Sequence, residues 1–152
     1  MTSASLPLAD THVRLLAGHA GNGNPVFEVL PARGLSSGVF ELAGSPGLVL
    51  GCAAGDVLHV SDDGQFEVRK AGRNLCVQAG PRSGYFTADA MTALTEDFEA
   101  VGGLVESPSD RRFIVVTVAR SVGIPVVTRL MEAWSTGFGQ GEWWFGNADD
   151  PE

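Results

Sequence analysis

The chain carries little positive charge. Of its 152 residues, only 10 are lysine or arginine, against 18 aspartates and glutamates, and the formal net charge is −8. Lys70 is the single lysine, and the arginines are scattered along the sequence. Contacts with nucleic-acid phosphates need clustered basic residues. The composition therefore argues against DNA or RNA as a partner.

Long apolar runs and cysteines are also scarce. No run reaches the roughly 18 residues of a membrane span, and the first ten residues, MTSASLPLAD, do not have the pattern of a secretory signal. The two cysteines, Cys52 and Cys76, lack the spacing of a metal site. Without an export signal, buried reduced thiols are expected in preference to a disulfide. These absences predict a cytoplasmic protein with no membrane partner.

What the chain does contain favours a folded core with many turns. Hydrophobic residues make up 44% of the sequence, with eight Phe and three Trp, which is enough apolar surface for a core. Twenty Gly and eight Pro suit short strands better than long helices. The length suits one domain or two small ones packed together.

Short β-type segments fill the first half. Residues 1–11 are expected to form a flexible leader, and residues 12–70 a small antiparallel β-barrel-like lobe or curled sheet. Gly- and Asn-rich turns separate the apolar runs, which is typical of hairpins. The expected strands are 13–17, 26–30, 39–42, 48–50, 56–60 and 66–69.

The second half alternates strands and helices. A strand at 74–78 precedes a helix that Thr87 caps and that ends at Gly102 and Gly103. Strands near 104–106 and 113–118 follow, then a helix from Pro125 to Gly137 and a strand at 142–145. This order predicts a ferredoxin-like β-α-β-β-α-β lobe over residues 71–146, followed by an acidic tail at 147–152. The expected fold class is α+β.

One face of the second sheet needs a cover. Alternate residues of 113–118 point to opposite faces and both sets are apolar, while helices cover only one face. In the strand 142–145, Trp143 and Phe145 share one face and Trp144 takes the other. The other cover is expected to be the first lobe, a second copy stacked through the sheet face or edge, or a ligand. A ligand pocket at this junction would have Arg73, Arg82 or Tyr85 at its mouth and Trp143 and Trp144 among its aromatic residues.

Catalytic groups are few. Cys52 with His59 is a conceivable nucleophile and base, and Asp56 with His59 an acid–base pair. Small-residue packing explains Cys52 more simply, and a turn explains Asp56. A metal site from Asp10, His12 and His19 is disfavoured because they lie near the N-terminus, where residues are often mobile. We expect no cofactor and no metal.

Several short motifs resemble a known family. They are Ser45-Pro46, Gly51, Gly55-Asp56-Val57, the Ala71-Gly72 step before a strand, and the terminal Trp-Trp-aromatic group. Over about residues 37–145 the chain resembles a family of small bacterial proteins catalogued as a domain of unknown function. The family pattern places Ser-Gly-His where this chain has Ala71-Gly72-Arg73, so hydroxyl or imidazole chemistry there is absent. The resemblance implies the fold order and no activity.

The sequence thus predicts a non-catalytic binding protein that engages a protein partner or a small molecule at the junction of its two lobes. One concrete version is an immunity or self-resistance protein, which small size, acidity and the lack of a catalytic motif suggest. The alternative is a small cytoplasmic enzyme that uses Cys52 and His59 or Asp56 and His59.

Overall fold

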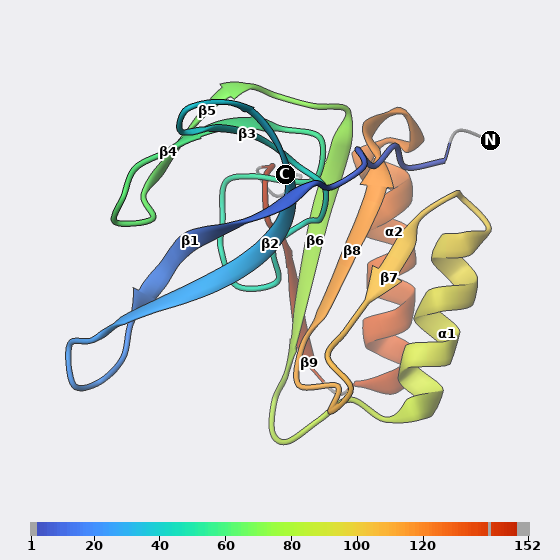
Figure 1. The fold of residues 1–152 in the computed structure, drawn as a ribbon. Helices are drawn as coiled ribbons and strands as arrows, with labels where there is room; N and C mark the ends of the chain where they lie inside the picture. The colour runs from blue at the N-terminus through green and yellow to red at the C-terminus, as the bar shows by residue number, and fades with distance from the viewer. Residues whose placement is uncertain (1–2, 140, 149–152) are drawn as a thin grey trace.

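Two antiparallel sheets and two α-helices make up the computed structural model, which describes residues 3–139 and 141–148 (Figure 1). The first sheet is a meander in which each strand pairs with the next along the chain. It contains β1 (Thr11–His19), β2 (Pro25–Ser36), β3 (Val39–Leu42), β4 (Val57–Val60) and β5 (Phe66–Lys70).

Of the two forms expected for the first lobe, a barrel or a curled sheet, the structure has an open, curled antiparallel sheet and no closed barrel. In the strand order β1-β2-β3-β4-β5, the two outer strands are not paired with each other. The sheet curls enough for the turn between β4 and β5 to reach β1, where the Leu16 amide donates to the Gly64 carbonyl at 2.9 Å. A single backbone contact at a turn leaves the rest of both edges unpaired, and the barrel does not close.

The second sheet has the strand order β7-β8-β6-β9. Its strands are β6 (Asn74–Pro81), β7 (Leu104–Glu106), β8 (Ile114–Ala119) and β9 (Gly141–Phe145), and a short 3₁₀ turn, η1 (Arg120–Val122), follows β8. Helices α1 (Ala88–Glu99) and α2 (Ile124–Phe138) connect them, so the chain runs strand, helix, strand, strand, helix, strand. Every pairing in this sheet is antiparallel.

Local sequence sets the ends of the helices. The Thr87 hydroxyl accepts a hydrogen bond from the Ala90 amide at 3.1 Å and so caps α1 as expected. Helix α2 does not stop at Gly137 as predicted. It continues to Phe138 and ends where Gly139 takes φ 60°, the left-handed conformation that glycine adopts without strain. Gly137 is an ordinary helical residue because nothing there requires a positive φ.

Both helices pack on one face of the second sheet (Figure 1). Leu94 and Phe98 of α1 and Met131 and Trp134 of α2 are buried in the same apolar cluster as Phe145. Trp143 joins this cluster with its ring 5.7 Å from that of Phe145, whereas Trp144 faces the other way and donates its indole N–H to Gln78 at 2.7 Å. The predicted division of the three aromatic residues between two faces is therefore what the structure has.

The other face of the second sheet is covered by the loop between β3 and β4, residues 43–56, which we call the covering loop. In Figure 1 this loop lies against β6 on the side away from the helices. The Gln78 side-chain amide donates to the carbonyls of Pro46 and Val49, each at 2.8 Å. Thr117 donates to the Ser45 hydroxyl at 2.7 Å. Of the alternatives that the sequence allowed for covering this face, the structure thus has a segment of the first half of the chain.

Residues 48–50 belong to this loop and do not form the strand expected of them. They do not form a strand because a side-chain carboxylate binds the backbone amides at this point of the chain. Glu28 of β2 accepts hydrogen bonds from three consecutive backbone amides, those of Gly47, Leu48 and Val49, at 2.8 to 3.1 Å. These amides converge on one anion and cannot also enter a strand ladder. Glu28 thereby ties the covering loop to the first sheet.

Candidate functional site

The cysteine considered as a nucleophile lies in the core. The Cys52 side chain is fully buried, and this desolvation raises the pKa of its thiol. Cys52 packs in the same cluster as Leu58, so His59, the next residue of β4, points to the opposite face of the first sheet. The structure therefore does not bring Cys52 and His59 together. A thiol with a raised pKa in an apolar site is the reverse of an activated nucleophile.

Asp56 has a structural task. One of its carboxylate oxygens accepts from the Ala53 amide at 3.0 Å and the other from the Gly72 amide at 2.6 Å. The side chain is buried at 3% exposure, so both oxygens are engaged inside the protein. Asp56 holds two backbone turns together, as its position before a strand indicated, and it is not presented to a substrate.

No metal site forms among the described residues, since nowhere do three or more His, Cys, Asp or Glu side chains converge. His12 and His19 lie near opposite ends of β1, and the Asp10 carboxylate accepts from the Gly34 amide at 2.9 Å. Among the same residues, no helix is both long enough and apolar enough to cross a membrane.

The five predicted binding residues do not meet. Arg73 precedes β6, whereas Arg82 and Tyr85 follow it, which separates the two groups by about 25 Å along the strand. Trp143 lies under the helices, and Trp144 lines a shallow hollow of about 290 Å³ beside Phe113. Of the five, Arg73 lines the larger hollow where the two sheets meet.

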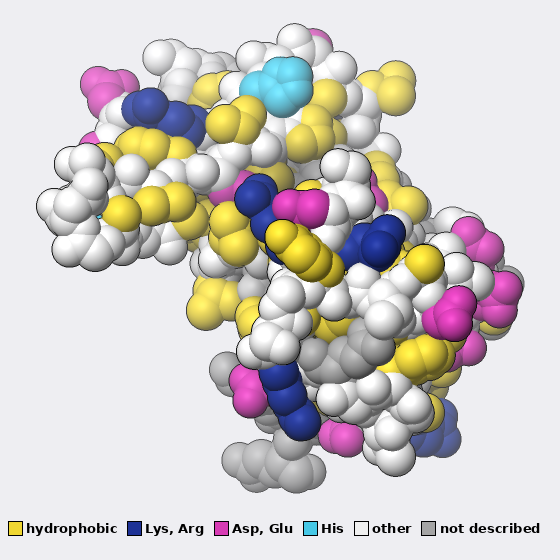
Figure 2. All heavy atoms as spheres, turned by 90° about the horizontal axis from the view of Figure 1, so that it is seen from below, with side chains coloured by type: hydrophobic (Ala, Val, Ile, Leu, Met, Phe, Trp, Pro, Cys, Tyr) yellow, Lys and Arg dark blue, Asp and Glu magenta, His cyan; other side chains and the backbone are white. Residues whose placement is uncertain are grey.

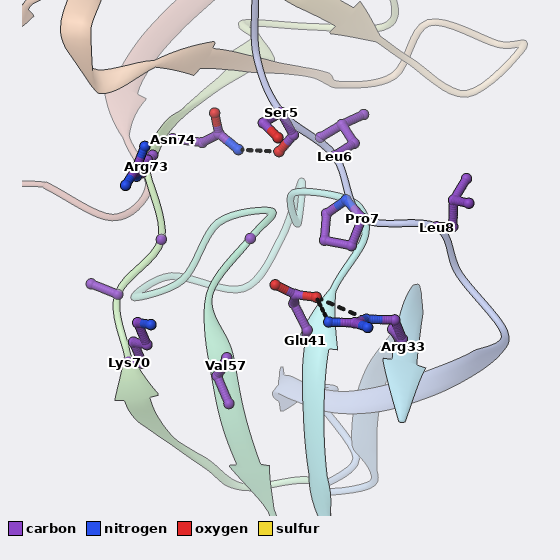
Figure 3. Close-up of a pocket in the computed structure, with 13 residues that line it drawn as sticks. Ser5, Leu6, Pro7, Leu8, Arg33, Glu41, Val57, Lys70, Arg73 and Asn74 are labelled. Atoms are coloured by element: carbon purple, nitrogen blue, oxygen red, sulfur yellow. Dashed lines mark hydrogen bonds and ion pairs between the residues drawn. The ribbon is translucent and has the colours of Figure 1, made fainter. Parts of the chain in front are cut away.

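That larger hollow, which we call the seam hollow, has a volume of about 600 Å³ and opens between the first sheet, the start of β6 and the N-terminal segment (Figure 3). Its walls mix charged, polar and apolar groups. They comprise Ser5, Leu6, Pro7, Leu8, Arg33, Glu41, Gly55, Val57, Lys70, Ala71, Gly72, Arg73 and Asn74.

One cross-strand row of the first sheet forms part of this lining. The register places Arg33 of β2 opposite Glu41 of β3, Glu41 opposite Val57 of β4, and Val57 opposite Lys70 of β5. Directly opposite residues share a face of the sheet. The row therefore runs cation, anion, apolar residue, cation, with about 4.8 Å between neighbouring strands.

The Arg33–Glu41 pair uses half of the Glu41 carboxylate. Both Nε and Nη2 of Arg33 donate to the same oxygen, Oε1, at 3.0 and 2.8 Å. The other carboxylate oxygen points away from Arg33 toward the middle of the seam hollow (Figure 3). Glu41 thus retains an acceptor for a ligand.

The turn from Lys70 to Arg73 is fixed by backbone contact. A Cβ on Gly72 would lie 2.6 Å from the carbonyl carbon of Gly55 and 2.7 Å from its oxygen, so only glycine permits this approach. The Asp56 carboxylate holds the Gly72 amide from below. Lys70 and Arg73 therefore flank a turn whose backbone is held at Gly72.

A second hollow of about 530 Å³ adjoins the first and shares Ser5, Gly72, Arg73 and Asn74 with it. Arg120 lines this second hollow, and its amide donates to the Arg73 carbonyl at 2.8 Å, next to the Asn74–Ala119 pair of the β6–β8 ladder. Arg73 and Arg120 thus follow directly on the last pair of the ladder, and like charges at opposed positions are unfavourable.

The N-terminal segment forms one wall of the seam hollow. The buried Asn74 side chain donates to the carbonyls of Ser5, at 3.0 Å, and Ala54, at 2.9 Å. The Ala4 amide donates to the Gly102 carbonyl at 3.0 Å. Residues 3–8, expected to be a flexible leader, are held across the junction of the two sheets by these bonds.

Sequence reasoning missed Lys70, Arg120, Arg33 and Glu41 as site residues. They come from four different strands or strand ends, and strand register, which the sequence does not state, brings them to one place. The available signal was the group of three cations Arg69, Lys70 and Arg73 within five residues at the predicted lobe boundary.

Comparison with known proteins gives fold and family. No curated protein matches the sequence. A solved structure from Neisseria gonorrhoeae, described as a "novel crystal structure of a hypothetical protein", is similar with a TM-score of 0.60 and 14% sequence identity, over 94% of this chain and 96% of that one. At this identity the likeness establishes a shared fold, which is a mixed α+β arrangement of two antiparallel sheets and two helices.

A family model confirms the resemblance suggested by the Gly55-Asp56-Val57 turn and the terminal tryptophans. The model matches residues 28–143, which include the covering loop, both helices and most of the lining of the seam hollow. Because this match spans more than half of the sequence, the chain belongs to the family described as "Domain of unknown function (DUF4265)".

Proposed function

We propose that the protein is a non-catalytic binding protein that takes the anionic group of a ligand into the seam hollow. The observation that carries the proposal is a local concentration of positive charge. Four of the ten lysines and arginines in a chain of net charge −8 line the two adjoining hollows, namely Arg33, Lys70, Arg73 and Arg120.

Three of these cations lack an acidic partner within the part of the chain that the structure describes. Among the described residues, ion pairs join Arg33 to Glu41 and Arg69 to Glu67, and none includes Lys70, Arg73 or Arg120. On the face drawn in Figure 2, basic and acidic side chains are interspersed, which is the ordinary solvated pattern. Unpaired cations that converge on a hollow differ from that pattern and favour a carboxylate or phosphate ligand.

A matched pair of arginine variants tests this proposal. We expect citrate and inorganic phosphate to shift amide NMR signals of residues 70–73 in the wild type. Arg73→Ala should weaken citrate binding up to about fivefold, the contribution of an exposed ion pair. Arg129→Ala, which removes an exposed arginine of α2, should leave it unchanged. Equal binding by both variants, or no binding by the wild type at millimolar concentration, contradicts the proposal.

The finer assignment of the second half is also a proposal. We propose that residues 71–146 are ferredoxin-like, with two β-α-β units interleaved so that the sheet order is β7-β8-β6-β9 and both helices lie on one face. An experimental structure with β7 beside β6 would contradict it. Edge-to-edge dimerisation and a role in immunity or self-resistance stay predictions.

A further inference from the structure

The order of charges along the seam hollow specifies more than an anion. The row Glu41–Val57–Lys70 places an acceptor and a cation at its two ends with an apolar residue between them. Glu41 and Lys70 are two strands apart, which corresponds to about 10 Å. A ligand that is only anionic would engage one end of this row and would be repelled by the other.

The Glu41 end is suited to an ammonium group. Its oxygen Oε1 is taken by Arg33, and the second oxygen faces the hollow (Figure 3). The Glu41 side chain is only 22% exposed, so a charged donor at this oxygen would be partly shielded from water. A carboxylate in that position prefers a positively charged N–H donor to a neutral one.

The opposite end is suited to a carboxylate. Lys70 and Arg73 rise from the turn that Asp56 and Gly72 hold rigid, and neither forms an ion pair with a described residue. Val57 lies between the two ends, and Leu6 and Pro7 line the same hollow beyond Glu41, on the side away from Lys70 (Figure 3). Val57 provides apolar contact for a short uncharged middle section of a ligand.

We propose that the ligand is a short peptide of about three residues with free ends, its amino group on Glu41 and its carboxylate on Lys70 and Arg73. An extended chain spans about 3.3–3.6 Å per residue, so three residues bridge about 10 Å. Both ends of such a peptide are ionised at neutral pH. This inference rests on the proposed function, because it assigns the same cations to the carboxylate of the ligand.

Four probes separate the two ends. Trialanine has both charges, N-acetyl-trialanine lacks the ammonium, trialanine amide lacks the carboxylate, and succinate carries carboxylates alone. We expect NMR titration to show that trialanine binds about fivefold or more tightly than either blocked form. Its affinity should also fall as the pH rises above about 8, where the peptide amine loses its proton.

Variants then assign each end. Glu41→Gln should abolish the preference for trialanine over its acetylated form and leave succinate binding intact. The matched control Glu67→Gln, at an exposed glutamate of β5, should keep the preference. The pH dependence of wild-type binding provides a readout that does not depend on how well Glu41→Gln folds.

The outcomes distinguish this inference from the proposed function. Equal affinities for trialanine and its acetylated form would overturn the peptide assignment, and succinate binding that depends on Arg73 would then leave the anion site standing. If the peptides, succinate, citrate and phosphate all fail to bind, both proposals fail. Binding of the amide form as tight as that of trialanine would also overturn the assignment of the carboxylate to Lys70 and Arg73.

Discussion

At the scale of single residues, the two buried thiols make the stability of the protein sensitive to alkaline pH. Desolvation raises the pKa of both Cys52 and Cys76 above the ordinary value of 9.0, that of Cys76 to about 12. Between pH 9 and 12 the unfolded chain therefore releases thiol protons that the folded chain keeps. The stabilisation is complete below pH 9 and is lost as the pH rises, by about 1.4 kcal/mol per pH unit for each thiol.

The corresponding measurement is urea unfolding at several pH values. We expect the free energy of unfolding to fall more steeply between pH 9 and 11 in the wild type than in a Cys52→Ala/Cys76→Ala variant. Thiol reagents at pH 8 should also modify the folded protein slowly and the urea-unfolded protein rapidly. Parallel slopes in the two proteins would show that the thiols do not carry this dependence.

Glu28 provides a second prediction at this scale. Replacing its carboxylate by the amide of Glu28→Gln leaves one oxygen for the three amides of residues 47–49. Hydrogen bonds to a charged acceptor contribute about 1.5–3 kcal/mol each, and part of this is retained by the amide. We expect a loss of about 2 kcal/mol in the free energy of unfolding by urea, against no measurable loss for the exposed Glu67→Gln.

At the scale of elements, the sequence was most informative where a pattern is local. The three- and four-residue spacing of Met91, Leu94 and Phe98 predicted α1, and the Thr87 cap predicted its start. The apolar run Leu48–Leu50 was misleading because a carboxylate from a distant strand takes its amides. Long-range contacts also explain why Arg73 was predicted as a site residue and Glu41 was not. Strand pairing, which the sequence does not state, places Glu41 in the same hollow as Arg73.

Replacing two glycines by alanine should change the stability of the protein in opposite directions. In Gly72→Ala the new Cβ meets the Gly55 backbone, which has no flexible side chain to move, so we expect a loss of about 2 kcal/mol or more. In Gly137→Ala the Cβ meets nothing within 4 Å in the interior of α2, so we expect a gain of up to about 1 kcal/mol. Thermal melts followed by circular dichroism measure both. A stable Gly72→Ala would contradict the close approach.

At the scale of the whole molecule, the covering loop couples the two sheets. The chain offers separate reporters for each half: all three histidines lie in the first sheet, and all three tryptophans lie in the second half. Because Gln78 and Thr117 bond to the loop, we expect one cooperative transition. Histidine NMR signals and tryptophan fluorescence should then give the same urea midpoint. Midpoints that differ by more than about 0.5 M, a sizeable part of a typical transition, would show that the halves unfold separately.

The covering loop also imposes an order in time. During synthesis, the first sheet leaves the ribosome before β6 and β8 have been synthesised. The carbonyls of Pro46 and Val49 can therefore accept hydrogen bonds from Gln78 only at a later stage. Until then, the hydrogen bonds to Glu28 are available to hold the backbone conformation of residues 47–49. In a nascent chain that stops near residue 70, the carbonyls of Pro46 and Val49 would lack their partner, and we expect the second half to complete its sheet by folding onto the covering loop.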